Sequence, residues 1–219
     1  MIDLASRRVT RELPQADEVR LRILDAAEQV FADRGYAGAT TREIAERAGI
    51  GKRMLFYYFP SKDAVYRDVL ERTIAGLVAI YEHTRTEPGP IGLGEGVEAL
   101  TRFTAEHLTA MKVWLREIID GGPHLEELTQ RYVAPLYARA GAGVASNMAS
   151  GAFRTGDPLH VLVNVGGITL FYFLIAPMLR LMWDRDPLDP AVLRERAAAV
   201  RECLLHGLAG PGRDKGDGT

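Results

Sequence analysis

The sequence is poor in the features that stabilise secreted or metal-dependent domains. It has one cysteine in 219 residues, so no disulfide can form within the chain. His107, Glu117, Asp120 and His124 match no metal-ligand spacing, and we expect no metal, cofactor or catalytic site. The formal net charge is −2, so no overall basic field attracts nucleic acid.

Long hydrophobic runs are also rare. One segment, residues 161–179, has no charge and is long enough to cross a membrane. It contains Asn164 and Pro177 and lacks a basic flank before it, which favours a helix buried on all sides in a soluble bundle. The N-terminal arginines precede no apolar run, so we expect no signal peptide, no membrane partner and a cytoplasmic location. We expect Cys203 to be a buried, inert thiol.

Apolar residues recur at helical spacing along nearly the whole chain. The pattern predicts an all-α protein, with an N-terminal three-helix helix-turn-helix domain at 17–64 and a larger helical domain at 65–210, to which the resemblance described below assigns ligand binding and dimerisation. Residues 1–16 are expected to be a flexible basic arm, and 211–219 a disordered tail. The Pro- and Gly-rich stretch 84–96 predicts a loop.

Helix signals are dense in the N-terminal domain. A first helix is expected at 19–34, ended by Gly35. Thr40 and Glu43 form a T-x-x-E capping box for a second, short helix. The turn at 48–51 leads to a third helix at 52–58, and Ser61 caps a fourth. Four helices are thus expected in this region, and a tight turn joins the second to the third. This arrangement is the sequence form of a helix-turn-helix.

Residues 23–65 resemble the DNA-binding domain of the TetR family of transcriptional regulators. The resemblance rests on a phenylalanine, a glycine and a threonine in order, an Ala-Gly turn at 48–49, an aromatic cluster and the motif F-P-S-K at 59–62. It implies a homodimeric repressor that binds double-stranded operator DNA. The rest of the chain resembles the family only in its helical layout.

The resemblance also implies which residues contact DNA, and their chemistry agrees. Lysine and arginine can donate to guanine or to phosphates. The expected DNA-binding residues are Thr41, Arg42, Lys52, Arg53, Tyr57, Tyr58 and Lys62. One departure is Phe56, which stands where the family usually has a tyrosine and which cannot donate to a phosphate.

In the family, the later helices surround a ligand cavity and the last two form the dimer interface. Here those two are the helices expected at 158–182 and 190–208, opened by Asp157-Pro158 and Asp189-Pro190. Polar residues within apolar stripes suggest a site for a small-molecule effector. The candidate ligand-binding residues are Phe103, His107, Met111, Trp114, Glu117, Tyr132, Tyr137, Asn164, Ile168 and Tyr172.

The residues leave two alternatives open beside a ligand-responsive repressor. The chain could be a ligand-independent DNA-binding regulator, either an activator or an architectural protein. It could also be a helical enzyme that retains a vestigial DNA-binding unit, which would require a nucleophile paired with a base in the cavity.

Overall fold

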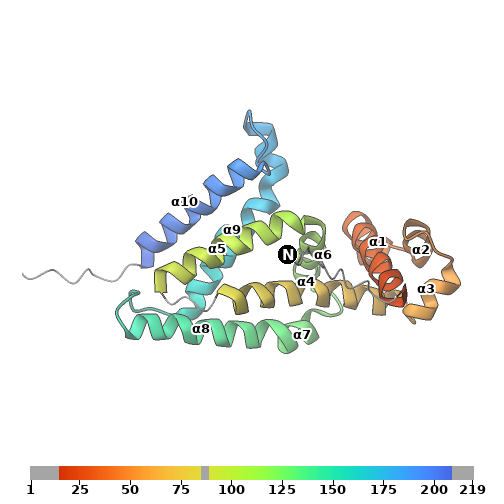
Figure 1. The fold of residues 1–219 in the computed structure, drawn as a ribbon, viewed down its shortest axis with the longest axis horizontal. Coiled ribbons are helices and arrows are strands. Elements are labelled where there is room, and N and C mark those ends of the chain that lie inside the picture. Colours follow the sequence, from red (N-terminus) through yellow and green to blue (C-terminus); the bar gives the residue numbers. More distant parts are fainter. Residues whose placement is uncertain (1–14, 85–88, 209–219) are drawn as a thin grey trace, which may run out of the picture. The chain divides into compact units, whose positions relative to one another are not determined.

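The computed structural model describes residues 15–84 and 89–208, and these are helical with no strand among them (Figure 1). The prediction of an all-α fold is confirmed. The contacts divide the chain into two compact units, one up to Val69 and one from Leu70. The expected basic arm lies outside the described residues except for its last two positions, which begin the first helix. The expected tail at 211–219 lies outside them entirely.

The first unit consists of α1 (Gln15–Gly38), α2 (Thr41–Arg47), α3 (Lys52–Tyr58) and the start of α4 (Lys62–Thr84). Its core forms where the apolar faces of these helices meet. The buried residues are Ile23, Leu24, Ala27, Val30, Phe31, Ile44, Ala45, Ala48, Leu55, Phe59, Val65, Tyr66 and Val69. Arg20 of α1 pairs with Asp68 of α4 and lies over the ring of Phe59, which closes one edge of this core.

Local capping explains the helix boundaries of this unit. The Thr40 side chain accepts from the Glu43 backbone N–H, and the Glu43 carboxylate accepts from the Thr40 backbone N–H, so the predicted capping box is confirmed. Gly51 is the N-cap of α3, and the Ser61 hydroxyl accepts from the N–H of Ala64 at 3.0 Å. Side-chain bonds thus begin α2 and α4, and a glycine cap begins α3, at the residues that the sequence predicts.

The end of α1 differs from the prediction. Gly35 does interrupt the helix, with φ 70° and ψ 174°, a conformation that favours glycine. Helical turns resume after it and continue to Gly38, instead of ending at Arg34. The kink directs Tyr36 back onto the aromatic rings of Phe31 and Tyr66, at centroid distances of 6.4 and 4.7 Å.

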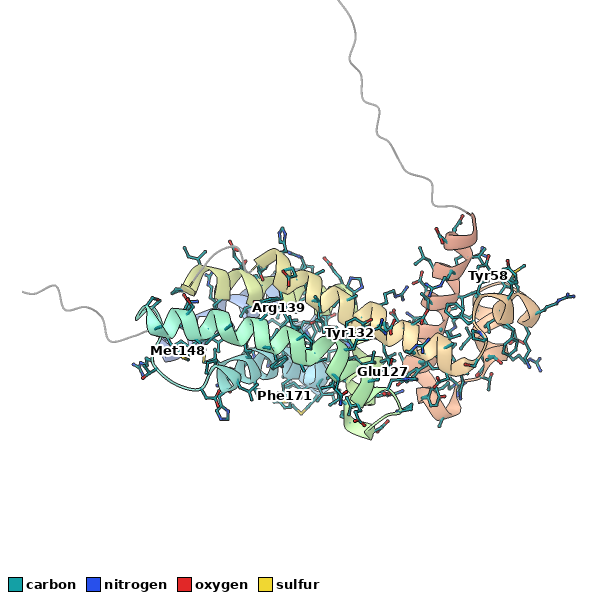
Figure 2. All side chains as sticks on the ribbon, turned by 90° about the horizontal axis from the view of Figure 1, so that it is seen from below. Tyr58, Glu127, Tyr132, Arg139, Met148 and Phe171 are labelled. Carbon is teal, nitrogen blue, oxygen red and sulfur yellow. The ribbon has the colours of Figure 1, made fainter. Side chains whose placement is uncertain are left out.

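The second unit contains the rest of α4, then α5 (Gly89–Glu106), α6 (Leu108–Asp120), α7 (Leu125–Leu128), the π-helical turn η1 (Thr129–Val133) and α8 (Ala134–Ala149). It ends with α9 (Pro158–Met182) and α10 (Pro190–Leu208). The chain of α7, η1 and α8 runs beside α4 (Figures 1 and 2). Two ion pairs join these elements, Arg131 to Glu71 at 3.1 Å and Arg139 to Glu82 at 3.4 Å.

One local prediction for this unit is wrong. The stretch 84–96 is not a loop throughout, because α5 begins at Gly89 and buries Gly94 and Val97. Gly94 lets the Arg201 side chain of α10 approach to within 2.8 Å of where a Cβ would lie, so helix packing outweighs the weak helix propensity of glycine. A π-helical turn lies just before Pro135, which fits the missing N–H of proline.

The last two helices begin as predicted. Asp157 accepts from the N–H of Leu159 at 2.8 Å, and Asp189 accepts from the N–H of Ala191 at 2.7 Å. The prediction that α9 is buried on all sides is wrong for a single chain. Its buried face includes Val161, Tyr172 and Phe173, whereas its exposed residues include Phe171, Leu174 and Met178. Residues 158–182 are the one described helix with the length and hydropathy to cross a membrane.

Cys203 is also placed differently from the prediction, because its thiol is exposed on α10. The neighbouring Leu204 is buried instead and packs with Val97 and Val200. The buried stripe of α10 thus passes through the residue after the cysteine and leaves the thiol on the solvent side.

Candidate functional site

The exposed surface of α3 carries most of the expected DNA-binding residues. Leu55 and Phe59 are buried and fix this short helix against the core of the first unit. The opposite side presents Lys52, Arg53 and Tyr57, and the Tyr57 side chain is 80% exposed. Tyr58, at the end of α3 (Figure 2), is half-buried and packs edge-on against Tyr57 at 5.3 Å. A rigid helix with two cations and a phenol facing solvent can donate to base edges and phosphates.

Thr41 and Arg42 lie in the first turn of α2. Arg42 is exposed, and its Nε donates to Glu46 one turn later at 2.8 Å. This hydrogen bond raises the pKa of Arg42 above its ordinary value, with the charge of Glu46 as the second cause. An exposed pair of this kind contributes little to stability, so exchanging Glu46 for a phosphate costs little.

The Lys62 side chain makes its contacts within the first unit. Its ammonium donates to the carbonyl oxygens of Tyr36 at 2.8 Å and Ala39 at 3.1 Å, and lies 4.5 Å from the centroid of the Tyr36 ring. The Tyr36 hydroxyl in turn donates to Asp63 at 3.2 Å. Lys62 therefore ties the end of α1 and the residue that follows it to the start of α4, a contact that sequence reasoning missed because it joins residues 23 and 26 positions apart.

We expect Lys62→Met to lower stability, because it removes two charge-assisted hydrogen bonds and keeps the apolar stem. The expected loss is about 1–3 kcal/mol, measured by urea unfolding followed by circular dichroism. Lys112→Met, at an exposed lysine of α6, is the matched control. An unchanged urea midpoint together with weaker DNA binding would show that the ammonium binds a DNA phosphate and does not stabilise the fold.

The candidate ligand-binding residues fall into three groups in the second unit. Met111, Trp114 and Glu117 share the buried face of α6. The ring of Phe103 of α5 packs at a tilt against the His107 ring at 4.5 Å, and lies so close to Gly76 of α4 that a Cβ there would lie 2.5 Å from it. The third group lies along η1, α8 and α9 and comprises Tyr132, Tyr137, Asn164, Ile168 and Tyr172.

The members of the third group differ in their surroundings. Asn164 is exposed on α9, and Ile168 packs against the core formed by Val97, Val200 and Leu204. Tyr137 approaches Gly166, and the guanidinium of Arg131 lies 5.1 Å from the Tyr132 ring. Figure 2 labels Tyr132 on the path that leads into α8. The structure thus gathers the α6 residues on one face but places Asn164 away from them.

Glu117 has a structural partner that the sequence does not reveal. The side chain is 1% exposed, and its carboxylate accepts from the backbone N–H of His124 at 2.6 Å. Gly122 packs directly on it, because a Cβ at this position would lie 1.9 Å from Oε2. The carboxylate therefore orders the turn between α6 and α7.

We expect Glu117→Ala to lower the stability of the protein by about 2–4 kcal/mol, because it leaves a cavity and an unsatisfied N–H. Glu117→Gln keeps the shape and an acceptor oxygen, so it should lose less. Thermal unfolding of the two variants beside the wild type measures the difference. Equal midpoints for all three proteins would contradict the structural role.

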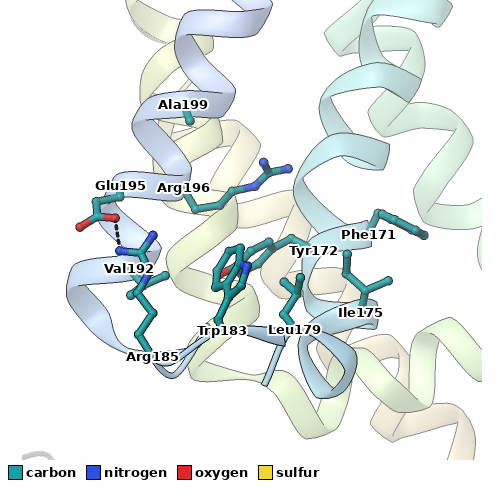
Figure 3. Close-up of a pocket in the computed structure, with 10 residues that line it drawn as sticks. All are labelled: Phe171, Tyr172, Ile175, Leu179, Trp183, Arg185, Val192, Glu195, Arg196 and Ala199. Atoms are coloured by element: carbon teal, nitrogen blue, oxygen red, sulfur yellow. Dashed lines mark hydrogen bonds and ion pairs between the residues drawn. The ribbon is translucent and has the colours of Figure 1, made fainter. Parts of the chain in front are cut away.

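A groove of about 410 Å³ lies between α9 and α10 (Figure 3). Its lining residues are Phe171, Tyr172, Ile175, Leu179, Trp183, Arg185, Val192, Glu195, Arg196 and Ala199. Of these, only Tyr172 is among the ligand-binding residues expected from the sequence. Burial raises the pKa of the Tyr172 phenol, which remains protonated and donates to the carbonyl of Pro187 at 2.8 Å.

Arginines cross and close this groove. Arg196 donates to the carbonyl of Ile168 at 2.9 Å and lies 5.2 Å from the Tyr172 ring. Arg185 donates to Glu195 at 2.6 Å and lies over Trp183 (Figure 3). These contacts hold α10 against α9 and leave the apolar edge at Phe171 open to solvent.

Two family profiles match the chain. "Bacterial regulatory proteins, tetR family" matches residues 23–69, and "Tetracyclin repressor-like, C-terminal domain" matches residues 92–203. The HTH-type transcriptional regulator RutR of Escherichia coli (strain K12) is 28% identical over 188 residues, which cover 85% of this chain and 88% of RutR.

Other relatives match one unit or the fold. The HTH-type transcriptional activator FasR of Mycolicibacterium smegmatis is 48% identical over 63 residues, 29% of each chain. The repressor NicS of Pseudomonas putida is 41% identical over 61 residues, 28% of this chain and 29% of NicS. The crystal structure of PfmR from Thermus thermophilus superposes with a TM-score of 0.69 at 23% identity, over 87% of this chain and 97% of that one. The chain therefore belongs to the TetR family, a family of helix-turn-helix transcriptional regulators and not of enzymes.

Proposed function

We propose that this protein is a homodimeric repressor that releases its operator when a small molecule binds the second unit. The observation that carries the proposal is the exposed face of α3, where Lys52, Arg53 and Tyr57 point to solvent from a helix fixed by buried Leu55 and Phe59. A helix so presented can enter a major groove and reach base edges. Such a protein acts where the DNA is, in the cytoplasm.

The exposed apolar face of α9 supports a dimer. Phe171, Leu174 and Met178 lie on one side of this helix and are about half exposed. Exposed apolar patches of this kind usually mark a contact with another protein. The groove between α9 and α10 shares Phe171 with this face, so we assign it to the contact between protomers and not to the effector.

The effector site is assigned to the second unit around α5 and α6. Phe103, Met111 and Trp114 supply apolar walls, and His107 supplies a polar group beside Phe103. Phe103 also touches α4 at Gly76, and α4 continues without a break to Lys62 in the first unit. A ligand that displaces Phe103 would therefore act directly on the helix that joins the two units.

The test is a titration of candidate small molecules with and without operator DNA. Trp183→Phe leaves Trp114 as the only tryptophan, so its fluorescence reports the proposed site. By linkage, an inducer must bind the free protein more tightly than the DNA complex, by about 5–150-fold for a typical coupling. Molecules that bind equally well in both titrations are not inducers. If every binder behaves so, the protein is a ligand-independent regulator.

The sign of regulation needs its own measurement. Two of the relatives that match a shorter stretch of the chain, FasR and NicS, are named an activator and a repressor, so the resemblance is compatible with either. Transcription in vitro from a promoter that carries the operator should fall as the protein is added. A rise would make the protein an activator while leaving DNA binding intact.

A further inference from the structure

The exposed face of α3 contains apolar surface as well as cations. Phe56 is 41% exposed and Met54 is 48% exposed, although Leu55 already packs this seven-residue helix against the core. Exposed apolar side chains gain free energy only when something covers them. Since two cations lie on the same helix, the charge favours a polyanion as the covering partner.

Phe56 lies next to Lys52 on α3. The two residues are four positions apart, which places them on the same side of a helix. The Lys52 ammonium lies 5.7 Å from the centroid of the Phe56 ring. A hydrogen-bond donor and an apolar ring are thus presented together to whatever α3 contacts.

The chemistry of the ring limits what Phe56 can recognise in DNA. Phenylalanine has no donor or acceptor, so it cannot bind a phosphate or a polar base edge. The apolar group that a base pair presents in the major groove is the 5-methyl group of thymine. We propose that Phe56 recognises a thymine methyl in the operator half-site, beside a base that Lys52 contacts. This inference rests on the proposed binding of operator DNA through α3.

The spacing of the pair locates the thymine. Successive bases on one strand are about 3.4 Å apart along the helix axis. The 5.7 Å between the ammonium and the ring therefore spans fewer than two base steps. The thymine lies within two base pairs of the base that Lys52 contacts.

The test starts from a half-site selected by the wild-type protein from random DNA duplexes. If no sequence is enriched, the proposed function fails and not this inference alone. Each thymine of the selected half-site is then replaced in turn by uracil, which lacks only the methyl group. We expect the wild type to lose about fourfold in affinity at one thymine, the value for burying one methyl-sized group.

Variants assign the methyl effect to a residue. Phe56→Ala should bind the thymine and uracil duplexes equally, whereas Met54→Ala should keep the wild-type ratio. Circular dichroism checks that both variants are folded. We expect both to fold, because the two residues are exposed. The inference is overturned if the half-site has no thymine, if the wild type does not distinguish uracil from thymine, or if the ratio persists in Phe56→Ala. It is also overturned if the sensitive thymine lies more than two base pairs from the position affected by Lys52→Ala.

Discussion

Replacing Lys52 and Arg53 together by alanine should abolish most sequence-specific binding to the operator. Both side chains are exposed at the start of α3, and neither is needed for the buried contacts of Leu55. A residue that donates to a guanine contributes about 1–3 kcal/mol, so the double variant should lose at least about tenfold in affinity. Fluorescence anisotropy with a labelled operator duplex measures this loss.

The control for this experiment is a double variant with the same change in net charge. Lys112→Ala with Arg102→Ala removes two exposed cations from the second unit. If the two double variants lose the same affinity, the effect is long-range electrostatics and not base recognition. Unchanged binding in the Lys52 and Arg53 double variant would reject α3 as the reading helix.

Leu174→Asp should convert the protein from a dimer to a folded monomer. Leu174 is 51% exposed in the single chain and lies on the apolar face of α9. A charge buried without a partner at a dimer interface is strongly unfavourable, whereas the same charge in water costs little. Sedimentation at micromolar concentration should give about twice the 24.1 kDa chain mass for the wild type and the chain mass for the variant.

The choice of residue matters for this test. Phe173 and Leu204 also lie on the last two helices, but both are buried within the single chain, so a charge there would unfold it. Ile91→Asp is the matched control, because Ile91 is a large exposed aliphatic residue in the first turn of α5. A wild type that sediments as a monomer, or a dimer that survives Leu174→Asp, would contradict the assignment.

Features set by neighbouring residues were predictable from the sequence. The capping box of Thr40 and Glu43 and the aspartate caps of α9 and α10 depend on side chains within three residues of the helix ends. Such bonds form wherever the chain is helical, so spacing alone predicts them. The exposure of Lys52 and Arg53 at the start of α3 was predictable as well, because charged side chains seldom lie in a core.

Features set by distant partners were not predictable. The start of α5 depends on the approach of Arg201 to Gly94, and the role of Lys62 depends on the kink at Gly35. The exposed side of α9 could not be chosen either, because apolar residues occur around most of its circumference. In each case the deciding contact joins segments whose proximity is a property of the whole fold.

The half-exposed apolar face of α9 has a consequence for how the protein works at low copy number. In the proposed dimer, a chain with this face uncovered must find a second chain before it can present two copies of α3 to one operator. Below the dissociation constant of the dimer, dimer concentration follows the square of chain concentration, by mass action. Halving the number of chains in a dividing cell would then lower the dimer concentration about fourfold, so regulation would respond steeply to dilution even when no effector is present.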